Sequence, residues 1–584
     1  MRDNLRLEAH APWMAGVVVG LVALIVYALT LSPTVNFIDS GEFIAVGRLA
    51  GIAHPPGYPL YTLLTIAGAA LPFGDSAVGV NFISALSGAV AVGFFYALVY
   101  ELISQHLTVP RNAEVSVKRN TVSASTLEHE IKGPEQPAVD WLVIGASAGA
   151  ALLLCGSFTV WNWSTQAKLY SLQFAFTATL FWLALRVRRS VRGAGEPRGL
   201  WPPRRPGVWS EPVRWLVFLA FGVGLALTNH TLSFTLLPSL AVIALWPEAR
   251  TRGGVPPAPT PKGGGRKVQQ KGQQAGARSH RARTVLDAPV WRWLLVSIPL
   301  VVIAALLPLV IYLYLPLRSA QNPVLNWGSP STWGDFWRHV TLWQNRVLVG
   351  RETPGGMAAY ITRSLDLAIG QFGPWLGLPV LLLAVVGGVR LARNALPILI
   401  AMLLLVVITV IETYNFQLAE VAAYFEQLYM MFIAWAGVGI WYLGGRIVNS
   451  RSAQEPGYEQ NRRSRIALAV IPLGLAALAL VWNAGRAGHA NDHLAEAYVH
   501  NEFSAFAPRA VVLTNNWYLV SPSFYLQLVR GEHADVAVID RKLLQYPFYL
   551  DYVTRQYPEV MASVKDLAGP FGEISRRWVD GEAI

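Results

Sequence analysis

Long runs of apolar residues, separated by short polar or basic stretches, dominate the chain. A helix needs about 20 apolar residues to cross a hydrocarbon layer roughly 30 Å thick. Eleven runs approach this length: 13–31, 78–103, 141–160, 169–187, 213–228, 231–246, 292–316, 373–390, 394–411, 425–444 and 466–483. The pattern predicts a mainly α, polytopic membrane protein with about eleven transmembrane helices.

Composition agrees with this interpretation. Charged residues make up only 14% of the 584 residues, against about 25% in soluble domains, and the mean hydropathy is +0.38. The net charge of +12 is concentrated in a few loops, with eight arginines in 186–214 and ten lysines or arginines in 247–292. Because cytoplasmic loops attract such an excess, the charge indicates topology and argues against nucleic-acid binding. The single cysteine, Cys155, excludes an intrachain disulfide and reads as a small buried residue.

The topology depends on a further apolar stretch, 58–71, which is about 14 residues long and short for a span. If it crossed the membrane, the arginine-rich loops would face outward, so the positive-inside rule favours an interfacial helix. The outer loop 32–77 then faces the extracytoplasmic side. We read the first run as a retained signal anchor, in a multi-pass protein of the cell inner membrane with an extracytoplasmic C-terminus.

Two domains are expected. Residues 1–485 form the transmembrane domain, with cytoplasmic linkers at 104–139, 188–212 and 247–291. Residues 486–584 form a small extracytoplasmic α/β domain, because strand 510–514, a helix 521–530 capped by Ser521, and strand 536–539 predict a parallel βαβ unit. Asn515 and Asp540 follow the strand ends, where ligands often bind, but a packing role is the favoured interpretation.

Two carboxylates in the outer loop, Asp39 and Glu42, are the candidate catalytic residues. They are three residues apart and would share one face of a helix. One can remove a proton while the other orients it, and burial near lipid should raise a carboxylate pKa and strengthen the base. The alternative is structural: Asp39 caps a helix and Glu42 completes a capping box.

Other polar residues on the predicted outer side could bind substrate. His54 precedes two prolines that hold it in an extended turn, and could bind a phosphate or merely stabilise the turn. Arg318 leaves a predicted span and could clamp a phosphate or snorkel to the interface. Asn229 and His230 lie at an outward helix tip and either line a cavity or satisfy the helix ends.

Metal and cofactor motifs are poorly supported. The outward segments contain no His-x-x-x-His, Cys-x-x-Cys or Asp-x-Asp pattern, and the basic loops contain no Walker loop. The sequence therefore predicts no metal and no cofactor.

Several motifs resemble one family in the same order along the chain. The sequence Asp-Ser-Gly-Glu-Phe at 39–43, Ala-His-Pro-Pro-Gly-Tyr-Pro-Leu at 53–60, and the segments 161–172, 229–230, 314–328 and 424–425 resemble GT-C glycosyltransferases. The group in question is related to the O-mannosyltransferase of plexin-type receptor domains. The likeness extends over nearly all of residues 10–550.

The resemblance implies a GT-C-type bundle and an inverting transfer. A sugar, such as mannose, would move from a polyprenyl-phosphate carrier, a substrate, to an acceptor hydroxyl on a protein or glycan at the outer face. Asp39 would be the base and Glu42 its neighbour. Arg318, His54 and Lys168 would bind the donor phosphate, and Asn229, His230 and Tyr424 would line the cavity. The family tends to have glutamate where this chain has Lys168, which could change the charge balance at the cavity mouth.

Two rival functions stay open at this point. A transporter or flippase of lipid-linked sugars also has many spans, but its sites lie near the bilayer midplane on broken, repeated helices. A receptor with a binding tail would leave the paired carboxylates without a purpose. Membrane lipids surround the protein in every case.

Overall fold

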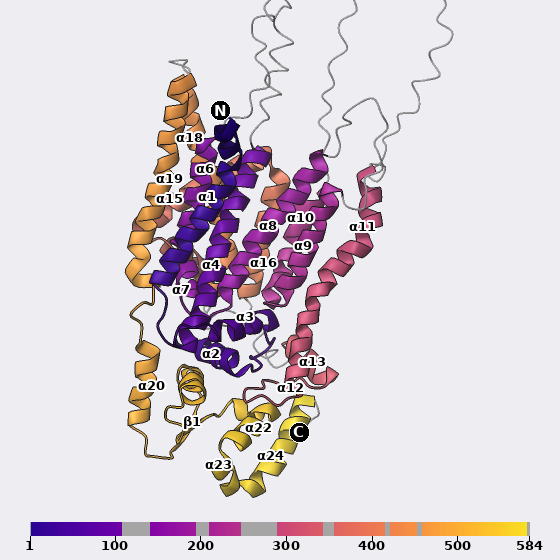
Figure 1. The fold of residues 1–584 in the computed structure, drawn as a ribbon, viewed down its shortest axis with the longest axis vertical. Helices are drawn as coiled ribbons and strands as arrows, with labels where there is room; N and C mark the ends of the chain where they lie inside the picture. Colours follow the sequence, from indigo (N-terminus) through magenta and orange to yellow (C-terminus); the bar gives the residue numbers. More distant parts are fainter. Residues whose placement is uncertain are drawn as a thin grey trace, which may run out of the picture.

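The computed structural model describes residues 2–107, 140–193, 210–246, 289–342, 356–414, 421–452 and 458–580. Its longer helices run side by side in a bundle (Figure 1), and shorter helices continue or connect them. These helices are α1 (Arg2–Leu29), α4 (Ser76–Glu101), α6 (Trp141–Cys155), α7 (Phe158–Ser164), α8 (Tyr170–Gly193), α9 (Glu211–Leu227), α10 (Leu236–Leu245), α11 (Pro289–Leu306), α14 (Gly356–Gly370), α15 (Pro374–Asn394), α16 (Leu396–Tyr414), α18 (Glu426–Ser452) and α19 (Tyr458–Ala487). Short irregular turns extend some of them: η1 (Leu102–Leu107), η3 (Thr231–Thr235) and η5 (Leu307–Leu313).

All eleven predicted spans contain helix. Within the described residues, seven helices are long and apolar enough to cross a membrane, and α6 with α7, bent by 63°, would make an eighth. The other three predicted spans correspond to α8, α9 and η3–α10. The last two are short, with α9 only 17 residues long and α10 only 10. Helix α8 is continuous, but polar residues and arginines lower its apolar character. The prediction of a mainly α, multi-pass membrane protein is confirmed.

A layer of short helices covers one end of the bundle (Figure 1). It contains α2 (Ser40–Leu49), α3 (Pro59–Ala69), α12 (Tyr314–Ser319) and α13 (Trp333–Val340), while α17 (Val421–Tyr424) precedes α18. With 11 residues, α3 is about 17 Å long at roughly 1.5 Å per residue, too short to span the membrane. The apolar stretch 58–71 is therefore not a membrane span, as the charge distribution predicted.

The C-terminal segment lies beyond this layer, at the same end of the bundle (Figure 1). It contains α20 (Leu494–Ser504), β1 (Val511–Thr514), α21 (Trp517–Phe524), η7 (Tyr525–Val529), β2 (Ala537–Asp540), η8 (Leu543–Gln545), α22 (Pro547–Gln556), α23 (Pro558–Ser563) and α24 (Lys565–Asp580). The strands β1 and β2 pair in parallel, with Val511 opposite Ala537. The predicted βαβ unit is thus confirmed.

Details of the βαβ unit differ from the prediction. The helix begins at Trp517, because the Asn516 side chain accepts the Tyr518 N–H and caps it; the cap predicted at Ser521 is wrong. Strand β1 is partly exposed, with Val511 48% and Leu513 62% exposed, whereas an apolar strand in a βαβ unit was expected to be buried. Asp540 accepts the N–H groups of the following turn, which is a structural role.

Basic side chains gather at the opposite end of the bundle from α2. Helix α4 begins near α3 and ends at Glu101, whose carboxylate lies 3.5 Å from Arg186 and 3.4 Å from Arg189 on α8. Arg465 pairs with Asp140 at the start of α6. The predicted linkers lie largely outside the described residues. The helix ends that flank them carry these charged side chains, and they lie at the end of the bundle away from α2.

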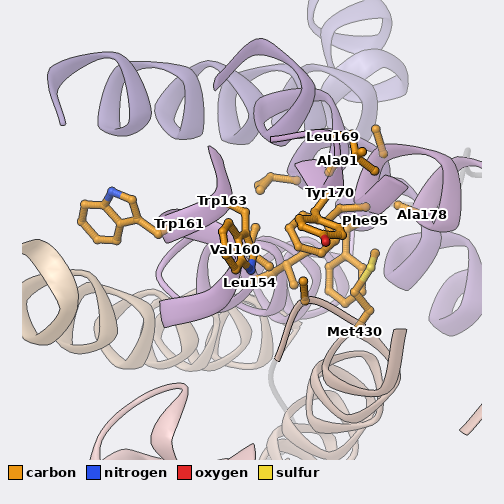
Figure 2. Packing of buried hydrophobic residues seen from close by; sticks show 14 of the residues in the cluster. Ala91, Phe95, Leu154, Val160, Trp161, Trp163, Leu169, Tyr170, Ala178 and Met430 are labelled. Carbon is orange, nitrogen blue, oxygen red and sulfur yellow. The ribbon is translucent and has the colours of Figure 1, made fainter. Parts of the chain in front are cut away.

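The turn between α7 and α8 is held by a buried aromatic core (Figure 2). The Trp163 and Tyr170 rings lie 5.3 Å apart, and Val160 and Leu169 are buried beside them. The Ser84 hydroxyl on α4 donates to the Lys168 carbonyl oxygen at 3.0 Å. The backbone at Lys168 is therefore fixed against the bundle.

Candidate active site

Helix α2 begins directly after Asp39, with Ser40 and Gly41 in its first turn. Asp39 occupies the N-cap position, but its side chain accepts no hydrogen bond from the helix N–H groups described. The Glu42 carboxylate also points elsewhere. The capping-box alternative is therefore wrong, and both carboxylates remain available for other interactions.

Glu42 and His54 form a tight pair. The fully buried Glu42 carboxylate accepts the His54 backbone N–H at 2.7 Å through Oε1 and faces Nδ1 of the imidazole at 2.8 Å through Oε2. Burial disfavours the protonated imidazole, but the Glu42 charge and hydrogen bond outweigh it and raise the pKa of His54 to about 9. His54 is thus a positively charged group at neutral pH, with 23% of its side chain exposed.

Asp39 is held from two sides. Its Oδ2 lies 3.6 Å from the Lys168 Nζ, and its Oδ1 accepts a hydrogen bond from the Trp517 Nε1 at 2.9 Å. The Lys168 side chain is 1% exposed, and its ammonium also lies over the Trp163 ring at 5.4 Å from the ring centre. The carboxylate therefore has fixed partners contributed by both the bundle and the C-terminal segment.

The electrostatics of Asp39 reverse one expectation. Burial alone would raise its pKa, but the charges of Lys168 and His54, with the Trp517 hydrogen bond, overcome that effect and lower the pKa. The predicted upward shift is wrong, because the sequence did not reveal these partners. Asp39 is consequently ionised at neutral pH and able to accept a proton.

An aromatic layer links His54 to the predicted cavity residues. The Tyr58 hydroxyl lies 3.3 Å from the His54 Nε2, and the Tyr58 ring stacks on His230 with centres 5.5 Å apart. His230 also meets Tyr424 edge to face at 5.9 Å. The His230 Nδ1 accepts the Leu232 N–H, and burial, then the charge of His54, lower its pKa to about 3, so this imidazole is neutral.

Asn229 lies beside His230 and donates to the Gln173 side-chain oxygen at 3.4 Å. The His230 hydrogen bond also satisfies the start of the following turn. His230 therefore satisfies a helix end, because it caps η3, and it also faces an aromatic cluster. That Asn229 and His230 line a cavity stays a prediction.

Arg318 is not brought into the cluster. Its guanidinium donates to the carbonyl oxygens of Ala50 at 2.5 Å and Leu49 at 3.2 Å, the residues that end α2. A third hydrogen bond joins it to the Gln321 side chain. Arg318 stabilises the C-terminus of α2 in this arrangement, where a cation is electrostatically favoured.

One set of side chains could hold a divalent cation. Asp39, Glu42 and His54 each offer a ligand atom, and these atoms lie within 4.8 Å of one another. A cation there would have to replace the His54–Glu42 hydrogen bond and approach the Lys168 ammonium that already pairs with Asp39. His54 and Lys168 thus already supply positive charge beside the two carboxylates, as a bound metal ion would.

Three neighbours of the site were missed from the sequence. Trp517 contacts Asp39 from the far C-terminal segment, and the Ser521 hydroxyl accepts the Glu42 N–H at 3.0 Å. His339 is buried against Gly57 and Gly328, and burial, then the His54 charge, lower its pKa to about 3. Tyr58 also was not named as a site residue, although it lies inside the motif at 53–60.

Comparison with known proteins finds a similarity in the N-terminal part of the chain. Residues 39–252 match the protein O-mannosyl-transferase TMEM260 N-terminal domain. The chain is 29% identical over 237 residues, 39% of its length, to protein O-mannosyl-transferase TMEM260 of Mus musculus. It is 39% identical over 85 residues, 14% of its length, to the Dictyostelium discoideum protein of that name. The aligned parts are 26% and 10% of those relatives' lengths.

Two solved structures show a similar course of the chain at low identity. The crystal structure of ArnT from Cupriavidus metallidurans in the apo state has a TM-score of 0.46 and 13% identity, covering 92% of this chain and 91% of that one. The archaeal oligosaccharyltransferase AglB from Archaeoglobus fulgidus, in complex with an inhibitory peptide and a dolichol-phosphate, has a TM-score of 0.45 and 10% identity, covering 89% and 64%. The family match itself contains Asp39, Glu42, His54 and Lys168. Residues 39–252 of the chain are therefore similar to the N-terminal domain of the TMEM260 protein O-mannosyl-transferases.

Proposed function

We propose that the protein is a membrane glycosyltransferase that moves a sugar from a polyprenyl-phosphate carrier to an acceptor hydroxyl. The sugar is a hexose such as mannose, the acceptor is a protein Ser or Thr, and the transfer inverts the anomeric carbon. The observation that carries the proposal is the Asp39 carboxylate, held ionised between Lys168 and Trp517 at the end of the bundle. This residue lies within the matched TMEM260 domain.

The proposed reaction uses the charges of the site in order. The Asp39 carboxylate accepts the proton of the acceptor hydroxyl, whose oxygen then attacks the anomeric carbon. The bond from that carbon to the carrier phosphate breaks, and the phosphate keeps the electron pair. His54 and Lys168 offset the developing negative charge, because both are positive and already in place.

Glu42 has a supporting part in this scheme. It accepts the His54 backbone N–H and faces the imidazole Nδ1, and it raises the pKa of His54, so His54 stays protonated while the phosphate departs. The Tyr58–His230–Tyr424 layer borders the other side of the His54 ring and would line the sugar cavity. Arg318 is left out of the phosphate site, since its guanidinium holds the end of α2.

The orientation follows from charge. Arg186, Arg189 and Arg465, with their ion pairs, lie at the bundle end opposite α2, and cytoplasmic ends attract positive charge. We therefore assign Asp39 and the C-terminal segment to the extracytoplasmic side of the cell inner membrane. Carrier lipids that present their sugars outward could reach the site from the bilayer.

Reconstitution tests the proposal. The full chain in liposomes should transfer label from undecaprenyl-phosphate-[¹⁴C]mannose, or from the glucose analogue, to a Ser/Thr-rich peptide. The product should have the anomeric configuration opposite to that of the donor. Label that changes leaflets without joining the peptide would support a flippase instead, and label that does neither would contradict the proposal.

A further inference from the structure

The C-terminal segment makes direct contact with both candidate catalytic residues. Helix α21 packs against the first turn of α2 so closely that a Cβ on Gly41 would lie 2.1 Å from the Ser521 carbonyl oxygen. The same turn of α21 provides the Ser521 hydroxyl, which accepts the Glu42 N–H at 3.0 Å. Only glycine allows this approach, so the two helices form one packed unit.

Trp517 is rigidly placed within this unit. It is the first residue of α21, whose N-terminus is capped by Asn516. Its ring packs edge to face on Trp327 at 6.0 Å and on Phe524 at 6.1 Å. The indole N–H, which can only donate, therefore points in a fixed direction, toward the Asp39 Oδ1 at 2.9 Å.

Further polar contacts fix the segment on the outer loops. The Tyr525 hydroxyl donates to the Asp75 carboxylate at 2.6 Å, and the Asn36 side chain donates to the Asp492 carboxylate at 3.3 Å. Asp492 precedes Trp517 in the sequence and Tyr525 follows it, and the two residues bind different parts of the outer loop, at Asn36 and Asp75. The position of the indole is thus set by the whole C-terminal segment.

We propose that the C-terminal segment completes the catalytic centre, with Trp517 as the positioning residue of Asp39. The inference rests on the proposed function, in which Asp39 is the base. With Trp517 on Oδ1 and Lys168 on Oδ2, the plane of the carboxylate is defined before substrate enters. The indole hydrogen bond also favours the ionised form, so it keeps the base ready without contacting substrate.

This role lies outside the shared family domain. The match ends at residue 252, whereas the indole comes from residue 517. The charged groups around Asp39 thus lie within the matched range, but the orientation of the base depends on a part of this chain that the matched domain does not include.

Removal of one N–H tests the inference. In the full chain, Trp517→Phe keeps an aromatic ring against Trp327 but loses the donor; benzothienylalanine at position 517, in which sulfur replaces the indole N–H, keeps the bicyclic shape as well. Hydrogen bonds to charged groups contribute enough that kcat should fall about 10–100-fold. KM for the undecaprenyl-phosphate-mannose donor should stay unchanged. The acid limb of the rate–pH profile should move to higher pH.

The control is Trp333→Phe, because the Trp333 indole is 67% exposed on the outer helix α13. This variant should keep wild-type kcat and the wild-type pH profile. If both position-517 variants, folded as judged by melting temperature, retain wild-type kcat and the acid limb, the inference is overturned while the transferase stands. If the wild-type protein transfers no sugar, the proposed function fails first, and the two failures are distinguishable.

Discussion

Replacing Lys168 with methionine removes the ammonium beside Asp39 while keeping an unbranched side chain in the same buried space. Nζ lies 3.6 Å from Oδ2, and two unit charges about 4 Å apart attract by roughly 4 kcal/mol at an effective dielectric constant of about 20. That value is an upper limit, because the Asp39 side chain is 19% exposed and water screens the pair. The energy is still large enough to decide the protonation state of the base.

Two consequences are expected for transfer by Lys168→Met. The pKa of Asp39 rises when the cation that lowers it is lost, so the acid limb of the rate–pH profile should move to higher pH. The departing phosphate also loses a fixed positive group, which costs about 10²–10³-fold in kcat. Initial rates in proteoliposomes across the acid and alkaline range measure both effects.

The matched variants separate charge from packing. Lys168→Arg keeps the charge and should recover part of the rate and the acid limb. Arg465→Met, which breaks the ion pair with Asp140 at the other end of the bundle, should change neither. A folded Lys168→Met protein with wild-type kcat and an unshifted acid limb would refute the assignment of Lys168.

Three further outcomes are expected. The pKa of His54 is raised from 6.5 to about 9, so its pair with Glu42 stabilises the fold fully below about pH 6.5 and loses this effect as the pH rises through about 9. Glu42→Gln should therefore lower the melting temperature more at neutral pH than above pH 9. An equal decrease in melting temperature at both pH values would speak against the pair. Gly41→Ala places a Cβ 2.1 Å from the Ser521 carbonyl oxygen and should destabilise the fold by about 1–3 kcal/mol in denaturant or thermal titrations, whereas Gly485→Ala in α19, with open space around it, should not. Chelation with EDTA should leave transfer intact, because Lys168 and His54 already supply positive charge at the carboxylates; loss of activity that Mn²⁺ restores would place a metal at Asp39, Glu42 and His54.

Local patterns in the sequence predicted the main elements of the secondary structure. Apolar length predicted the helical segments of the bundle, and the apolar run 58–71 was separated from true spans by length and charge. The alternation of strand and helix predicted the parallel pairing of β1 with β2. These features depend on neighbouring residues, whose spacing is visible in the chain.

The partners of the candidate base were not predictable in this way. Lys168 and Trp517 reach Asp39 from segments far along the chain, and the direction of its pKa shift depends on their distances. Arg318 shows the converse. Its position after a predicted span suggested phosphate binding, but in the folded chain its guanidinium donates to the carbonyl oxygens of Leu49 and Ala50 at the end of α2. Charge in a sequence shows which chemistry is possible, whereas packing decides which group meets which.

The Asp39→Asn variant tests the central claim most directly. Asparagine keeps the size of the side chain and can still accept the Trp517 N–H, but it cannot act as a general base. Under single-turnover conditions with bound undecaprenyl-phosphate-mannose, the rate of transfer should fall about 10²–10⁴-fold, while donor binding and melting temperature stay near those of the wild-type protein. Transfer by the folded variant at the wild-type rate would show that Asp39 does not remove the acceptor proton.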